Sequence, residues 1–195
     1  RFPEALPAQA VRVVHAGPSD KAAVAVVWPT FVAEPARRRE EYAVELLSYV
    51  FDDALRREVR ERLGKSYSPA VSFGAPDRAD QGYLAAGAET GAADLAVVEA
   101  AVRAVAADLA TGRITEEMFA SARAPLLASA AADMADNDWI AAHLSGSVRD
   151  PQKLRDLVEA PQVLANLSLD EIKRAAAQWL ARAPLVVIAE PEPRT

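Results

Sequence analysis

The sequence contains no cysteine, so disulfide bonds, thiol catalysis and thiolate metal sites are excluded. It has only two histidines, His15 and His143, and neither has a second histidine or a well-placed glutamate one helical turn away. A zinc peptidase site needs such ligands close together, so we expect no metal site and no catalytic residue in this chain. No apolar run approaches the roughly 18 residues of a membrane helix, so no membrane span is expected.

The sequence also lacks an excess of basic charge, since 28 acidic residues outnumber 22 basic ones and the formal net charge is −6. Nucleic-acid binding would need a basic face, so no nucleic-acid partner is expected. The one tight basic run, Arg37 to Arg39, is followed at once by Glu40 and Glu41, which is typical of a solvated helix start rather than of a phosphate or lipid patch. The chain begins at Arg1 with no methionine or signal-like stretch, and we expect it to be a piece of a longer protein.

Apolar periodicity and turn residues predict one domain over residues 10–191, with a linker over 1–9 and a tail over 192–195. Short valine- and alanine-rich runs predict strands, and apolar residues at three- and four-residue steps predict helices. The predicted strands are 11–14, 22–28, 68–75, 81–90 and 185–189. Four helices are predicted over 37–63, 95–109, 139–147 and 151–159. A further helix is predicted to begin at Thr115, its cap, and to bend near Pro125. The last predicted helix begins at the Ser168/Glu171 capping box and ends at about residue 181.

This order of elements favours an α+β fold. Neighbouring strands can pair as hairpins, so we expect a mainly antiparallel sheet with helices packed on one face.

Several stretches of the sequence partly match known enzyme motifs, but each lacks a residue that the motif requires. Gly64-Lys65-Ser66 resembles the end of a phosphate-binding loop, yet Val59 stands where the motif needs glycine, and a helix rather than a strand precedes it. Ser147 lacks the glycine of a nucleophile elbow. Asp52 and Asp53 are adjacent on a predicted helix, so their carboxylates diverge by about 100° and cannot share a target.

Arg60 and Tyr67 flank the predicted helix stop at Gly64. A helix end and a strand start joined by a tight turn can bring both side chains to one rim, where a guanidinium and a phenol would donate to a carbonyl or an oxyanion. The alternative is structural: Arg60 only complements the helix dipole, and Tyr67 only packs at a strand edge.

The stretch Val59–Ser68 resembles the Leu-Arg-Glu-Lys-Leu-Gly-Leu-Ala-Tyr-Ser signature of pitrilysin-type (insulin-degrading enzyme-like) zinc metallopeptidases, which lies in their zinc-free, C-terminal domain. Weaker similarities at Asp20–Ala22, Gly112–Glu117, Leu167–Ile172 and Val186–Ile188 follow in the same order along the chain. The resemblance spans roughly Val11 to Pro191. Three departures stand out: valine at 59, Asp52-Asp53-Ala54 in place of a glycine- and serine-rich stretch, and the polar pair Lys65 and Ser66.

The resemblance implies a chamber built from two homologous halves, with zinc expected only in the partner half. This chain would hold the peptide substrate, with Arg60 bonding a substrate carbonyl and Tyr67 steadying the same backbone or the tetrahedral intermediate. The partner would be a homologous zinc-bearing domain or subunit, and a periplasmic location is favoured. Two other hypotheses stay open: a non-enzymatic pseudopeptidase subunit that scaffolds an active partner, and an unrelated α+β binding module.

Overall fold

The computed structural model describes residues 7, 9–31, 35–62, 68–74, 82–147 and 152–192. Five strands form one sheet in the order β1-β5-β2-β4-β3. The strands are β1 (Val11–His15), β2 (Ala22–Pro29), β3 (Ala70–Gly74), β4 (Tyr83–Thr90) and β5 (Leu185–Pro191). The last strand of the chain therefore lies between the first two, and β3 forms an edge of the sheet.

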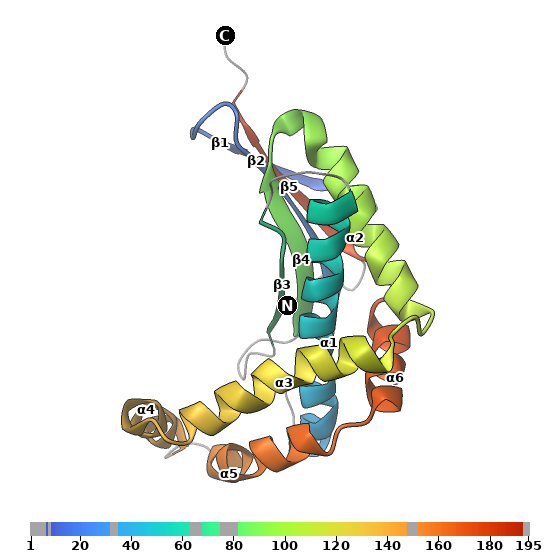
Figure 1. Cartoon of the computed structure of the whole chain (residues 1–195). Helices are drawn as coiled ribbons and strands as arrows, with labels where there is room; N and C mark the ends of the chain where they lie inside the picture. The colour runs from blue at the N-terminus through green and yellow to red at the C-terminus, as the bar shows by residue number, and fades with distance from the viewer. Residues whose placement is uncertain are drawn as a thin grey trace.

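Helices cover one face of this sheet, as Figure 1 shows for α1 and α2, whereas α3 crosses α1 lower in the view. The helices are α1 (Arg38–Arg56), α2 (Leu95–Ala110), α3 (Glu116–Asp133), α4 (Asn137–Ser147), α5 (Gln152–Ala165) and α6 (Leu169–Trp179). Short 3₁₀ turns precede α1 (Pro35–Arg37) and α2 (Ala92–Asp94), and a π-helical segment, Arg57–Arg62, continues α1. The α+β fold with helices on one face is confirmed.

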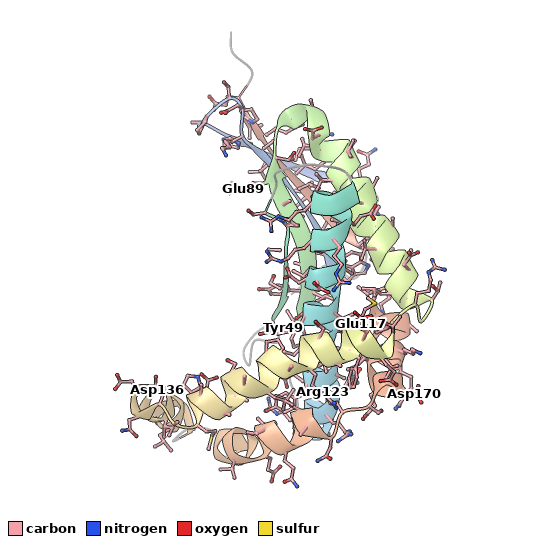
Figure 2. The ribbon with its side chains drawn as sticks, viewed as in Figure 1. Tyr49, Glu89, Glu117, Arg123, Asp136 and Asp170 are labelled. Atoms are coloured by element: carbon pink, nitrogen blue, oxygen red, sulfur yellow. The ribbon has the colours of Figure 1, made fainter. Side chains whose placement is uncertain are left out.

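The core lies between the sheet and α1, α2 and α6. Along β2 every second side chain is buried, from Ala22 to Trp28, because alternate residues of a strand face the same side. Phe51 of α1 is fully buried and meets Trp28 edge-on, with ring centroids 5.8 Å apart. On the opposite face of the sheet, Glu89 of β4 is exposed (Figure 2). One face of the sheet therefore contributes most of the buried apolar surface.

The predicted helix boundaries at Thr115, Ser168 and Gly112 are confirmed. The Thr115 hydroxyl accepts a hydrogen bond from the Met118 amide at 3.1 Å, which satisfies a donor at the start of α3. Ser168 and Glu171 form a complete capping box at the start of α6. Gly112 follows α2 with φ of +83°, a left-handed conformation that favours glycine.

The sheet is less uniformly antiparallel than the sequence predicts, because β1 pairs with β5 in parallel. Strand β5 enters between β1 and β2 and runs antiparallel to β2. Its run Leu185–Ala189 is entirely apolar, which suits an interior strand, whereas β1 carries Arg12 and exposed Val13 and lies at the edge. The first two strands therefore do not pair as the expected hairpin, because β5 lies between them.

Two helical predictions need correction. The helix predicted over 151–159 extends to Ala165 as α5, through Pro161, and this extension buries Leu164 in the core. The arginine run at the start of α1 is not simply solvated. Arg39 forms an ion pair with Glu171 and donates to the Asn166 carbonyl at 2.8 Å, so it links α1 to the start of α6. Among the described helices, none is both long and apolar enough to cross a bilayer.

Candidate functional site

Arg60 lies in the π-helical segment that extends α1, and its side chain is exposed. The four residues Leu47, Phe51, Leu55 and Val59 are fully buried at successive four-residue steps. Ser48, Asp52, Arg56 and Arg60 each follow one of them directly in sequence, so they share the adjacent side of the helix. Ser48, Asp52 and Arg56 lie beside β3, and Arg60 follows Arg56 by four residues, in the π-helical segment.

Asp52 joins this side of the helix to β3. Its carboxylate accepts a hydrogen bond from the Val71 amide at 3.0 Å and another from Nε of Arg56 at 2.6 Å. The adjacent Asp53 instead pairs with Arg57 at 2.7 Å. The expectation that the two carboxylates diverge is therefore confirmed, and Asp52 fixes the position of the strand that follows Arg60.

A cleft of about 350 Å³ lies between α1 and β3. Its helical wall is made by five residues of α1: Glu45, Ser48, Tyr49, Asp52 and Arg56. Its other wall is the edge strand, residues 70–73. Figure 2 places Tyr49 on α1 near the crossing with α3. We call this space the α1–β3 cleft.

Negative charge gathers along the helical wall of the α1–β3 cleft. Burial raises the pKa of the Glu45 carboxyl, and the carboxylate of Glu41 raises it further. The pKa of the Tyr49 phenol is also raised, first by burial and then by Glu45, Asp133 and Asp52. Both shifts arise because a further negative charge is unfavourable in a partly desolvated acidic environment.

Tyr67, the other predicted substrate-binding residue, lies outside the described residues, as do Gly64, Lys65 and Ser66. Arg60 is therefore the one member of the predicted pair whose place is known. The convergence of the two side chains stays a prediction.

The histidines do not form a site within the described residues. His15 closes a turn after β1, where its Nδ1 accepts from the Gly17 amide at 3.0 Å and its Nε2 lies 3.1 Å from the Lys21 carbonyl. The side chain of His143 lies outside the described part. In the ranges that the structure describes, no three histidine, aspartate or glutamate side chains are grouped so as to hold a metal ion.

The sequence analysis missed Glu45, Tyr49 and the bridging role of Asp52. The sequence does contain a pattern that groups them. Glu45, Tyr49, Asp52 and Arg56 recur at three- and four-residue steps, which places them on one polar side of the helix whose apolar stripe the sequence predicted. That spacing identifies one helix side, but it does not say which strand packs against it.

The model of the Peptidase M16 inactive domain matches residues 1–126. A search among curated proteins finds no match. Among solved structures, the fold is similar to that of a conserved protein from Enterococcus faecalis, with a TM-score of 0.78 and 14% identity over 100% of this chain and 44% of that chain. It is also similar to the periplasmic protease PqqL from Escherichia coli, with a TM-score of 0.77 and 16% identity over 96% of this chain and 21% of that chain.

A third similar structure is the inactive peptidase domain of a proposed zinc protease from Bordetella parapertussis. Its TM-score is 0.74 at 17% identity, over 90% of this chain and 96% of that chain. This chain therefore corresponds to nearly all of that domain, but to less than half of the E. faecalis chain and about a fifth of PqqL. The match to the family model covers well over half of the sequence and confirms the resemblance to pitrilysin-type peptidases. The chain belongs to the Peptidase M16 inactive domain family.

Proposed function

We propose that this chain is the substrate-holding, zinc-free half of a zinc-dependent endopeptidase. A homologous zinc-bearing half, on the same or a separate chain, would complete a chamber in which peptides are hydrolysed. The observation that carries the proposal is the position of Arg60, exposed at the end of the helix side that borders the α1–β3 cleft. The family membership and the greater length of the E. faecalis and E. coli relatives support a second half.

The chemistry of Arg60 suits a role in holding substrate. A guanidinium remains charged at all physiological pH values and presents several donors in a fixed plane, which suits the oxygen of a peptide carbonyl. Arg56 is held by Asp52 and Arg57 by Asp53, whereas no described residue forms an ion pair with Arg60. Of these three arginines, Arg60 is thus the one whose donors remain available for a substrate.

In the complete protein, zinc in the other half would polarise the scissile carbonyl and activate a water molecule. Arg60 would donate to a carbonyl of the bound peptide and so fix its position. Tyr67 would donate its phenolic proton in a hydrogen bond to the same backbone or to the developing oxyanion. Neither residue would be a zinc ligand, so their loss should affect turnover and not metal content.

The test uses the full-length protein with its zinc-bearing half. Arg60→Ala and Tyr67→Phe should each lower the rate of peptide hydrolysis sharply, while zinc content measured by atomic absorption stays at the wild-type level. Wild-type turnover in both variants would exclude the roles proposed here. Absence of turnover in the wild-type protein, with zinc bound, would favour the scaffold function.

A further inference from the structure

The outer halves of α3 and α5, together with α4, project beyond α1 at the lower left of Figure 1. Within the described residues, Leu126 of α3 is the last buried side chain before this projection, and Leu164 of α5 is the first after it. Leu127 and Ala130 are only partly buried at its base. We call residues 127–147 and 152–160 the helical arm, and the rest of the described chain the body. Because the arm buries little apolar surface against the core, little free energy holds it in one position.

Each of the two helices that join the arm to the body contains one proline. Pro125 directly precedes Leu126 in α3, and Pro161 lies three residues before Leu164 in α5. A proline has no N–H and its ring clashes with the carbonyl four residues earlier, so each helix lacks one intrahelical hydrogen bond at this point. Both helices are therefore weakened where they leave the core.

The body side of the two prolines is fixed by Arg123. Its guanidinium lies over the Phe119 ring, 4.6 Å from the ring centroid. Its Nη1 donates to the carbonyl oxygens of Ala165 and Leu167, each at 3.4 Å. These contacts tie α3 to the end of α5 and to the turn before α6, so a bend is confined to the part beyond the prolines.

The end of α3 in the arm lies near the α1–β3 cleft. Tyr49 lines this cleft. Burial and the Glu45 carboxylate raise the pKa of the Tyr49 phenol, and the Asp133 carboxylate of α3 raises it further, which requires Asp133 to be close by. A change in the angle of the arm therefore moves Asp133 relative to Tyr49 and alters the width of the cleft at this end.

We propose that Pro125 and Pro161 form a hinge at which the arm bends as a unit, and that the bend widens and narrows the α1–β3 cleft beside Tyr49. Two helices packed side by side can bend together when each contains a proline, whereas a continuous helix in either place would resist. The hinge does not depend on the roles proposed for Arg60 and Tyr67.

The size of the motion follows from the length of α3 beyond Pro125. Ala132 follows Pro125 by seven residues, which is roughly 10 Å along the helix. A bend of about 20°, the size that a proline permits, would therefore move Ala132 by about 4 Å. Glu117, on the body side of Pro125 in the same helix, would not move.

Double electron–electron resonance in the full-length protein measures this motion. Spin labels are attached to p-acetylphenylalanine, so that cysteines outside this chain stay unlabelled. The test pair joins Ser72, on the strand wall of the cleft, to Ala132 on the arm, and the control pair joins Ser72 to Glu117 (Figure 2). All three side chains are exposed. The distance distribution of the test pair should be broader than that of the control pair by about 4 Å.

Replacing both prolines, as Pro125→Ala with Pro161→Ala, should remove this extra width. Each alanine restores an N–H and removes a ring from a helix interior, so the unfolding midpoint should not fall. Pro184→Ala is the matched control, because Pro184 lies just before β5 and outside both helices, and it should keep the wild-type width. Equal widths of the two pairs in the wild type, or a wild-type width of the test pair in the double variant, would overturn the hinge.

Discussion

Asp52 and Val71 are 19 residues apart in sequence, and a hydrogen bond of 3.0 Å from the Val71 amide to the Asp52 carboxylate joins them. The bond spans the segment that contains Arg60 and the predicted residue Tyr67. It ties the helix that carries Arg60 to the first strand after that segment. The position of the helix that carries Arg60 relative to β3 therefore depends on this contact.

Replacing Asp52 by alanine should destabilise the fold by about 1–3 kcal/mol, because the Val71 amide loses its charged acceptor in a partly buried position. Urea unfolding monitored by circular dichroism measures the change. Asp53→Ala is the matched control, because Asp53 pairs with Arg57 on a more exposed part of the same helix turn. The control should cost about 0–1 kcal/mol. Equal losses in the two variants would contradict the bridging role of Asp52.

Glu171 should make stability depend on pH in the acid range. The hydrogen bond from Arg39 is the main cause that lowers its pKa to about 2, assisted by bonds from Ser168. In the unfolded chain the value is about 4.3. Because the folded state binds the proton less readily, the contribution is complete above about pH 4.3 and is lost as the pH falls toward 2.

Glu171→Gln should therefore flatten the stability profile between about pH 4.5 and 2, as measured by urea unfolding at a series of pH values. Glu99→Gln serves for comparison, since the ion pair of Glu99 is with Arg103, one turn away on the same helix, α2. If the unfolding free energy of Glu171→Gln changes with pH in parallel with that of the wild type, the ion pair between Arg39 and Glu171 does not lower the pKa of the Glu171 carboxyl.

Phe51 should be the most sensitive single position of α1. Its side chain is fully buried against Trp28, so Phe51→Ala leaves a cavity and should cost about 3–5 kcal/mol in unfolding free energy. Phe51→Leu retains much of the volume and should cost less. Denaturant unfolding of both variants gives the comparison, and a loss below about 1 kcal/mol for the alanine variant would place Phe51 outside the core.

The sequence predicted the elements whose signals are local. The stripe of Val44, Leu47, Phe51 and Leu55 predicted α1, and the Ser168/Glu171 pair predicted the start of α6, because both depend on residues within one or two turns. The helix through Pro161 was underestimated, since burial of Leu164 outweighs the local cost of proline.

Long-range pairing was harder to predict. Nothing near β1 indicates that β5 would separate it from β2, and nothing near Asp52 names the Val71 amide as its donor. Arg60 was identified through a family signature, whereas Glu45 was not, because its environment comes from the packing of β3 and α3 beside α1. Residues whose role depends on contacts distant in sequence are visible only in the folded chain.

The central claim is that Arg60 holds the substrate of a zinc peptidase assembled with a second half. The most direct measurement is kcat/KM for peptide hydrolysis by the full-length protein carrying Arg60→Gln, with Arg57→Gln as the matched control, since Arg57 is paired with Asp53. We expect Arg60→Gln to lower kcat/KM by about 10- to 150-fold, because the peptide carbonyl loses one charged hydrogen-bond donor worth about 1.5–3 kcal/mol, with Arg57→Gln close to wild type. Equal kcat/KM values for the two variants would contradict the claim.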